Sequence, residues 1–482
     1  MGVGVSSWRL ANTVARTGNL GVVSGTAVAV TIARTLGLGD PGGHIRRALD
    51  AFPIPAVAER VYERFFGTAD SRPGDRFKSI GRPSLDPSDQ SAELTVAANF
   101  VEVFLAKEGH NGPVGINFLE KIQLPTLPSL YGAMLANVDY VLMGAGVPAR
   151  IPATIDALTQ HSKVALPVDV VGADKGETFE SEFDPARLFD GEIISPIDRP
   201  LFLAIVSSAT LARYLATNSN GSPDGFVVEY PVAGGHNAPP RGKMQLDDQG
   251  EPIYGSRDAV DLDAIAALGL PFWLAGGYAD PDRLADAQQA GAVGVQVGTA
   301  FAFCRESGLA DELKSQVIDA ARRGQLRVRT DPKASPTGYP FKLLEVDGTL
   351  ARTEVYNQRV RRCDLGYLRE MYKRDDGRAG YRCPAEPVDD YLRKGGDVAR
   401  TEGSQCLCNG LMTDIGLGQV RNNNYAEPAL LTAGDDAVHV ARLLPEGSDS
   451  YGALDVLSHI LGRDMSAEAG PSRRPPRSRP AD

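Results

Sequence analysis

Long uninterrupted runs of apolar residues are absent from this chain of 482 residues. About 18 uncharged apolar residues are needed to cross a bilayer, and the stretch 20–32 is too short. The N-terminus also lacks the hydrophobic block and cleavage pattern of a signal peptide, because Arg9 and Arg16 interrupt its apolar residues. We therefore expect no membrane association and a cytoplasmic location.

The chain also has fewer positive than negative side chains: 50 Lys and Arg against 61 Asp and Glu, which gives a net charge of -11. A nucleic-acid partner is disfavoured, since a phosphate backbone is bound by a positive surface. Five cysteines in a chain this long do not make a secreted disulfide framework. A length of 482 residues allows one large α/β domain and a smaller appendage, and a hydrophobic fraction of 43% is ordinary for a globular enzyme.

Short apolar runs bounded by glycine or proline alternate with segments of helical periodicity, which is typical of βα units. One such helix is predicted at 281–290, with Asp280 as N-cap. Seven runs are predicted to be strands: 20–24, 113–117, 140–144, 163–171, 225–229, 272–276 and 293–298.

A closed parallel barrel of this class has eight strands, so the pattern predicts a (β/α)₈ TIM barrel whose first strand is missing. Residues 1–6 resemble the glycine-rich loop that follows a first strand, and 7–16 the first helix. We therefore expect the first strand upstream of Met1 and a misassigned start. An incomplete barrel with an exposed strand edge is the alternative.

Three further segments complete the predicted organisation. The barrel spans 1–345 and contains a long helical insertion at 28–110 after the second strand, far longer than an ordinary βα connection. Within the insertion, 44–52, 57–66 and 93–107 have helical spacing, whereas 71–90 is predicted to be a loop. Residues 346–462 form a cysteine-containing C-terminal extension. The Pro, Arg and Ser-rich tail at 463–482 is expected to be disordered.

Two glycine loops, one βα unit apart, predict a phosphate site. They are Leu274-Ala275-Gly276-Gly277-Tyr278 and Gln296-Val297-Gly298-Thr299-Ala300. In a parallel barrel a cofactor phosphate sits between the last two βα loops, where glycines let backbone amides approach and a short helix presents its N-terminus. Either loop alone indicates only a turn.

His236 directly follows the predicted strand end in Ala233-Gly234-Gly235-His236-Asn237. This is the catalytic face of a barrel, where a neutral imidazole could take a proton from a substrate carbon or stabilise a developing negative charge. A histidine that only hydrogen-bonds loop backbone is the alternative.

These segments resemble the signatures of the nitronate monooxygenase family, formerly called 2-nitropropane dioxygenase, which is related to FMN-dependent enoyl-acyl-carrier reductases. The resemblance covers roughly residues 1–345, including Gly115-Ile116-Asn117 and Ser335-Pro336-Thr337-Gly338. It implies a barrel with noncovalent FMN and His236 as base or positioning residue. The implied flavin contacts are Met1, Gly2, Val3, Asn117, Gly234, Gly235, Ala275, Gly276, Gly277, Gly298 and Thr299.

The sequence departs from the family before the histidine. Established nitronate oxidases tend to carry a Gln-Gly-x-Glu run, where this chain has Glu229-Tyr230-Pro231-Val232. After the histidine, Asn237 and Arg241 are candidate substrate contacts, since an arginine can hold a carboxylate or phosphate and the substrate could be a larger anion. A solvated or loop-bracing role is the alternative for Arg241.

Two further motifs have competing interpretations. Gly144-Ala145-Gly146-Val147-Pro148-Ala149 imitates a dinucleotide-binding fingerprint, but that fingerprint needs a doubly wound sheet, so a barrel loop is the better interpretation. Four cysteines could bind zinc or an iron-sulfur cluster, although their spacing matches no standard knuckle and reduced thiols are the alternative. They are Cys363, Cys383, Cys406 and Cys408.

The sequence thus predicts an FMN-dependent oxidoreductase of nitronate monooxygenase type, which oxidises a nitronate or similar anionic carbon substrate with dioxygen. Two alternatives stay open. One is an NAD(P)H-dependent enoyl-thioester reductase on the same barrel. The other is a noncatalytic flavin-barrel partner subunit. The sequence leaves the physiological substrate and the oligomeric state undetermined.

Overall fold

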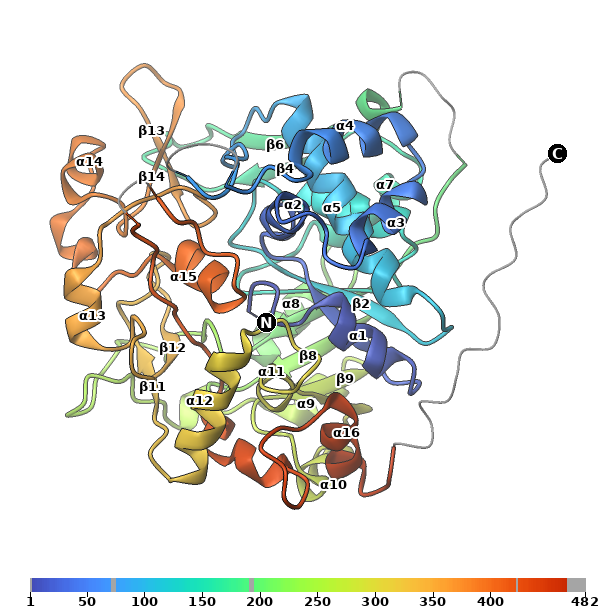
Figure 1. Cartoon of the computed structure of the whole chain (residues 1–482), viewed down its shortest axis with the longest axis vertical. Coiled ribbons are helices and arrows are strands. Elements are labelled where there is room, and N and C mark those ends of the chain that lie inside the picture. Colours follow the sequence, from blue (N-terminus) through green and yellow to red (C-terminus); the bar gives the residue numbers. More distant parts are fainter. Residues whose placement is uncertain (1, 71–74, 190–194, 422–423, 466–482) are drawn as a thin grey trace.

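A parallel sheet of seven strands lies at the centre of the computed structural model, which describes residues 2–70, 75–189, 195–421 and 424–465 (Figure 1). Its strands follow the order β1-β2-β3-β7-β8-β9-β10, and every neighbouring pair is parallel. The predicted parallel α/β architecture is confirmed. The strands are β1 Gly21–Ser24, β2 Val114–Leu119, β3 Tyr140–Gly144, β7 Leu201–Val206, β8 Gly225–Glu229, β9 Phe272–Ala275 and β10 Gly294–Gln296.

The two ends of this sheet, β1 and β10, have no further strand partner among the described residues. The N-terminal segment lies along β1, where Ser24 N–H donates to Ser6 O at 2.9 Å and Ser6 Oγ donates to Val22 O at 2.6 Å. Gly308 N–H in turn donates to Val5 O at 2.9 Å. Closure by an eighth strand stays a prediction.

One predicted barrel strand is wrong. Within 163–171, β4 (Val164–Val168) pairs antiparallel with β6 (Phe179–Phe183) and lies outside the seven-stranded sheet. Its place between β3 and β8 belongs to β7. The physical reason is burial, because a central parallel strand is covered on both faces. Most of β7 is buried, whereas β4 carries Pro167 and is partly exposed in its middle.

Four helices stand between β1 and β2, where the helical insertion was expected. They are α2 Val28–Gly37, α3 His44–Asp50, α4 Pro55–Phe65 and α5 Asp89–Lys107. The longest, α5, buries its apolar residues against α1 (Trp8–Ala15), α2 and α6 (Thr126–Leu135). Ser88 begins it as N-cap by accepting from Ser91 N–H. These helices cover the upper right of the view in Figure 1.

The connections that follow β3 are mostly short helices. They are α7 Ile151–Thr159, α8 Ala209–Ala216, α9 Leu262–Ala266, α10 Pro281–Gln289, α11 Thr299–Ala302 and α12 Asp311–Arg322, with short 3₁₀ turns at 185–188 and 256–258. At α10, Asp280 is the N-cap residue and Pro281 the first helical residue, as predicted. The Asp280 carboxylate, however, pairs with Arg442 and His459 instead of capping the helix.

The C-terminal residues pack onto the sheet domain. Leu10 and Val14 of α1 share one hydrophobic cluster with Val456 and Ile460 of α16. The predicted boundary at residue 346 stays a prediction, and 466–482 of the predicted tail lies outside the described residues. The strand β5 (Val170–Val171) pairs with β13 of the C-terminal residues. From residue 328 onward, the elements are β11 Val328–Asp331, β12 Phe341–Leu344, α13 Thr353–Gln358, β13 Glu370–Lys373, β14 Ala379–Arg382, α14 Val388–Arg393, α15 Leu407–Asp414, α16 Ala453–Leu461 and 3₁₀ turns at 398–401 and 435–443.

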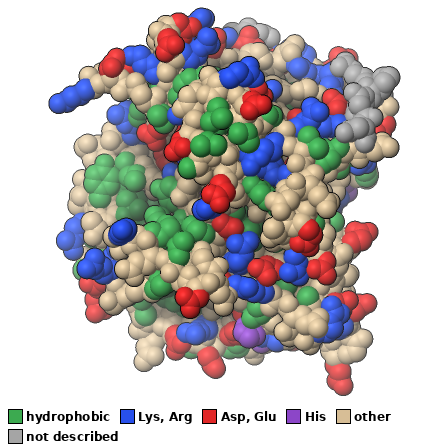
Figure 2. Space-filling view, turned by 90° about the vertical axis from the view of Figure 1, so that its left-hand side faces the viewer, with side chains coloured by type: hydrophobic (Ala, Val, Ile, Leu, Met, Phe, Trp, Pro, Cys, Tyr) green, Lys and Arg blue, Asp and Glu red, His purple; other side chains and the backbone are tan. Residues whose placement is uncertain are grey.

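The surface carries charges of both signs. On the face drawn in Figure 2, Lys and Arg side chains are interspersed with Asp and Glu, and hydrophobic side chains gather in a hollow. Within the described ranges, none of the helices combines the length and the apolar character needed to span a membrane.

Removal of one buried hydroxyl tests how firmly the C-terminal part supports the sheet domain. Tyr451 is fully buried, and its Oη donates to Ala300 O in α11 at 2.7 Å. We expect Tyr451→Phe to lower the free energy of unfolding by about 1–3 kcal/mol, because the Ala300 carbonyl loses its buried donor. Urea denaturation measures the change. Tyr214→Phe, at a tyrosine that is 54% exposed, is the matched control and should leave stability unchanged.

Candidate active site

One cavity of about 620 Å³ opens at the carboxyl ends of the sheet strands, a size within the usual range of small-molecule sites. The described residues that the family resemblance assigns to flavin, together with His236, all line this cavity, and Met1 lies outside the described residues. Those lining residues are Gly2, Val3, Asn117, Gly234, Gly235, His236, Ala275, Gly276, Gly277, Gly298 and Thr299. Sequence positions almost 300 residues apart thus meet at one place, and their role as flavin contacts stays a prediction.

The two glycine loops follow β9 and β10. Gly276 and Gly277 have φ angles of 102° and 73°, a backbone conformation that favours glycine. Among the described residues, no backbone acceptor is found for the N–H groups of Gly276, Gly277, Gly298 and Thr299. Because backbone N–H groups need a partner, these four donors would be satisfied by an anionic oxygen in the cavity.

The space beside Gly298 agrees with a ligand there. A Cβ atom at this residue would meet no protein atom within 4 Å, although its φ of -120° allows any side chain. Gly298 therefore leaves room that the protein itself does not use. Free donors and open space together fit the phosphate of a flavin mononucleotide.

His236 is held by contacts from two distant segments. Phe341 of β12 packs edge-on against its ring at 4.8 Å, and Ser335 Oγ lies 2.7 Å from His236 Nε2. The neighbouring Gly235 N–H donates to Thr432 Oγ1 at 2.9 Å, and Lys342 N–H donates to Gly235 O at 2.9 Å. The loop and the imidazole ring are therefore held in one orientation at the cavity wall.

The electrostatic surroundings keep His236 neutral. Burial lowers the pKa of His236 to about 3. A base with so low a pKa is weak at neutral pH, because an effective general base has a pKa near the working pH. Of the two predicted roles, base and positioning residue, this environment favours positioning by a neutral imidazole.

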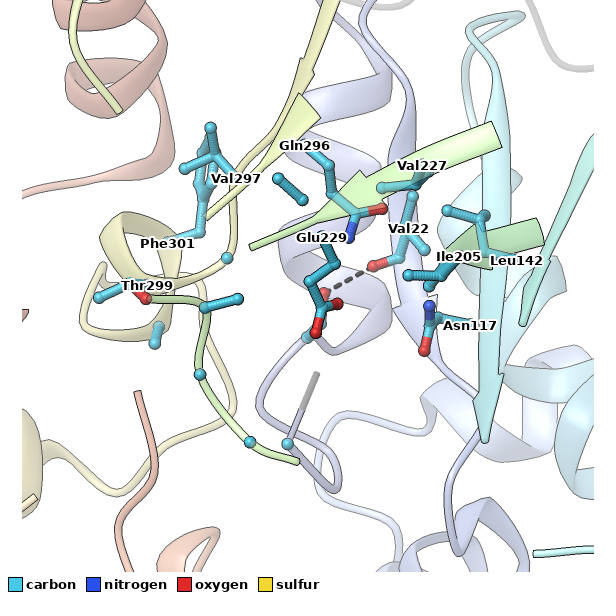
Figure 3. A pocket seen from close by; sticks show the side chains of 18 of the residues that line it. Val22, Asn117, Leu142, Ile205, Val227, Glu229, Gln296, Val297, Thr299 and Phe301 are labelled. Carbon is cyan, nitrogen blue, oxygen red and sulfur yellow. Dashed lines mark hydrogen bonds between the residues drawn. The ribbon is translucent and has the colours of Figure 1, made fainter. Parts of the chain in front are cut away.

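A carboxyl group that the sequence patterns did not assign to the site also enters the cavity. Figure 3 shows Glu229 extending from the end of β8 into the pocket, into which Asn117 of β2 and Thr299 also point. The local signal was an acidic residue at the end of a buried strand. Sequence alone did not distinguish it from a solvated loop carboxylate.

The C-terminal part contributes further lining residues that were not predicted. Thr432, Ala433 and Asp436 come from the segment before and within the 3₁₀ turn at 435–443. Gly434 N–H donates to Thr299 Oγ1 at 2.9 Å and joins this segment to the second glycine loop. No local motif marks these positions, so only the tertiary structure reveals them.

The two candidate substrate contacts do not line the cavity. Asn237 is 2% exposed, and its Nδ2 donates to Ala233 O at 3.0 Å, so it braces the histidine loop. Arg241 is exposed and donates to Ser207 O at 3.1 Å. The loop-bracing alternative describes Arg241 better than an anion contact.

The four C-terminal cysteines do converge, since all of them line one small separate cavity. Nevertheless, across the described ranges no group of three or more His, Cys, Asp or Glu side chains is arranged to hold a metal ion. Burial raises the pKa of each thiol and favours protonated sulfur, which is a poor metal ligand. The predicted zinc or iron-sulfur site at Cys363, Cys383, Cys406 and Cys408 is therefore not supported.

Comparison with known proteins identifies the segment that contains the loops. Residues 198–334 match the family model described as nitronate monooxygenase. A probable nitronate monooxygenase of Staphylococcus haemolyticus is 31% identical over 117 residues, which are 24% of this chain and 31% of that protein. The (3aS,4S,5R,7aS)-5-hydroxy-7a-methyl-1-oxo-octahydro-1H-indene-4-carboxyl-CoA dehydrogenase of Mycobacterium tuberculosis is 27% identical over 144 residues, 30% of this chain and 36% of that one. The matches thus span about a third of the length of these relatives.

Likeness to solved structures is broad but remote. FabK from Thermotoga maritima aligns with 97% of this chain and 92% of its own, at 14% identity and a TM-score of 0.46. Nitroalkane oxidase from Streptomyces ansochromogenes aligns with 97% and 94%, at 15% identity and a TM-score of 0.43. The relation to the nitronate monooxygenase family therefore rests on the sequence matches. Residues 198–334, with the histidine loop and both glycine loops, match the nitronate monooxygenase family model, and the predicted resemblance is confirmed for this segment.

Proposed function

We propose that this protein is an FMN-dependent oxidoreductase of nitronate monooxygenase type that passes electrons from a carbon substrate to dioxygen. The observation that carries the proposal is one cavity lined by His236 and by four residues whose N–H groups have no backbone acceptor among the described residues. The family match over 198–334 supports it.

Each part of the cavity has a distinct task in this proposal. FMN, when bound, supplies the two-electron chemistry that no amino-acid side chain provides. The N–H groups of Gly276, Gly277, Gly298 and Thr299 hold its phosphate. His236 orients the substrate as a neutral hydrogen-bonding group, and the apolar strand residues Leu142, Ile205 and Val227 keep water from the reacting atoms.

A side chain at Gly298 should compete with the phosphate. We expect Gly298→Val to raise the dissociation constant for FMN by about tenfold or more, which corresponds to about 1.4 kcal/mol. The protein itself should tolerate the change, because the space around a Cβ is open. Fluorescence quenching of FMN titrated with apoprotein measures the affinity.

Gly255→Val is the matched control for this measurement. Gly255 also has a negative φ, and a Cβ added there would meet no protein atom within 4 Å, but this residue does not line the cavity. FMN should bind this variant as tightly as wild type. Equal affinity in Gly298→Val would place the phosphate elsewhere.

The reaction itself is tested by anaerobic reduction of the bound flavin. We expect ethyl nitronate to bleach the flavin faster than NADPH bleaches it. We expect the variant His236→Ala to retain FMN, while its turnover rate falls by about 100-fold. Stopped-flow absorbance follows the bleaching. Because the pKa of His236 is about 3, wild-type rates should show no inflection from this residue between pH 5 and 9.

Other outcomes of the same experiment select the other candidates. Faster bleaching by NADPH would favour the NAD(P)H-dependent enoyl-thioester reductase, and the Mycobacterium tuberculosis relative is likewise named for a CoA thioester, a carboxyl-CoA. Full activity in His236→Ala would contradict the role of the imidazole. Purified protein that never binds FMN would favour the noncatalytic partner subunit.

A further inference from the structure

Glu229 carries a partly buried carboxyl group to which the proposed function assigns no task. It ends β8, where its Cα is paired with that of Ala275 in β9, and its side chain extends into the cavity (Figure 3). Within the described part of the chain, neither a hydrogen bond nor an ion pair to its carboxylate is found. Ionising a carboxyl group with little solvent around it and no partner costs free energy, and carboxyl groups with shifted pKa values cluster at functional sites.

The positive amino terminus of the chain lowers the pKa of Glu229, but the loss of solvent that raises this pKa is the larger effect. No Lys or Arg is among the described residues that line the cavity. The other titratable side chains of the lining are His236, Asp436, Tyr278, Tyr367 and Cys408. Asp436 already pairs with Arg442 at 3.0 Å, and the nearby Lys121 lies over the ring of Tyr339 at 3.9 Å.

Two ionisable groups in this cavity therefore differ in what they do at neutral pH. Burial raises the pKa of Glu229 to about 7, whereas burial lowers the pKa of His236 to about 3. Glu229 can both accept and release a proton near neutrality, and His236 stays uncharged. Pairs of titratable groups with widely separated pKa values indicate which one carries the acid-base chemistry.

We propose that Glu229 is the catalytic base of this site, and that it removes a proton from the carbon beside an electron-withdrawing group of a neutral substrate. The step breaks one C–H bond and forms one O–H bond on the Glu229 carboxylate. The electron pair of the broken bond stays on the substrate as a carbanion delocalised onto its electron-withdrawing group. This inference rests on the proposed function only in its choice of substrate.

The same carboxylate determines the class of substrate. A preformed anion such as a nitronate would stand next to a negative group in a cavity whose described lining contains no Lys or Arg, and like charges at close range repel. A neutral carbon acid such as a nitroalkane avoids this repulsion and becomes anionic only after its proton has moved to Glu229. The preferred substrate is therefore a neutral carbon acid, and a preformed nitronate, the anionic substrate expected from the sequence, is used less well.

Deuterium exchange tests the proton transfer without any redox step. The FMN-loaded protein is incubated in D₂O with nitroethane, and loss of the α-protons is followed by NMR. We expect exchange well above the buffer rate, with a rate that rises with pH and levels off above about pH 7, and a loss of about 100-fold or more in Glu229→Gln. Exchange no faster than in buffer, or equally fast in Glu229→Gln, overturns the proposal.

Glu102→Gln is the matched control. Glu102 is buried, and its pKa is raised to about 7 like that of Glu229. Unlike Glu229, it lies in α5, accepts from Trp8 N–H at 2.7 Å and does not line the cavity. The glutamine keeps that accepting oxygen. The exchange rate of this variant should equal that of the wild-type protein. Equal rates would show that the loss of exchange in Glu229→Gln is not a general effect of removing a buried carboxyl group.

Difference infrared spectroscopy gives a readout that is independent of activity. The infrared band of the protonated Glu229 carboxyl group is identified by its absence in Glu229→Gln. In the wild-type protein, this band should disappear as the pH rises through about 7. Titration of that band below pH 5 would contradict the proposal. Failure of the proposed function looks different: nitroethane protons would exchange in a Glu229-dependent way, but the flavin would not be reduced by nitroethane or by ethyl nitronate.

Discussion

The parallel direction of seven strands is the constraint on which the candidate site depends. Because every strand in the sheet runs the same way, all their carboxyl ends and the loops that follow lie at one edge. Asn117, Glu229 and the two glycine loops come from different strands, yet they reach one cavity for this reason. An antiparallel neighbour would have sent its loop to the opposite edge.

The C-terminal part supplies the second constraint, because it forms hydrogen bonds with donors and acceptors of the loops that follow the sheet strands. Thr432 accepts from Gly235 N–H, Gly434 donates to Thr299, and Tyr451 donates to Ala300 O. These contacts connect the histidine loop and the second glycine loop to residues more than 130 positions away. Among the described residues, no backbone acceptor is found for the N–H groups of Gly298 and Thr299 in the second of these loops, and both residues line the cavity.

Three predictions depended on local patterns, and their outcomes differ for physical reasons. The run 163–171 has the composition of a strand, but the sheet takes the more apolar 201–206, since a central strand is covered on both faces. Arg241 stands five residues after His236 in sequence and yet turns away to Ser207. The four cysteines gather around one cavity, although their burial favours thiols over metal ligands.

The sequence by itself determined the parallel α/β class, the two glycine loops and the position of His236 after a strand, because strand periodicity, glycine turns and strand ends are local properties of the chain. Only the tertiary structure decided which strand stands fourth in the sheet, that residues 432–436 complete the cavity, and that Glu229 enters it. Those features depend on burial and on long-range contacts. A pKa of about 7 for Glu229 is set by the loss of water around it, which no local pattern records.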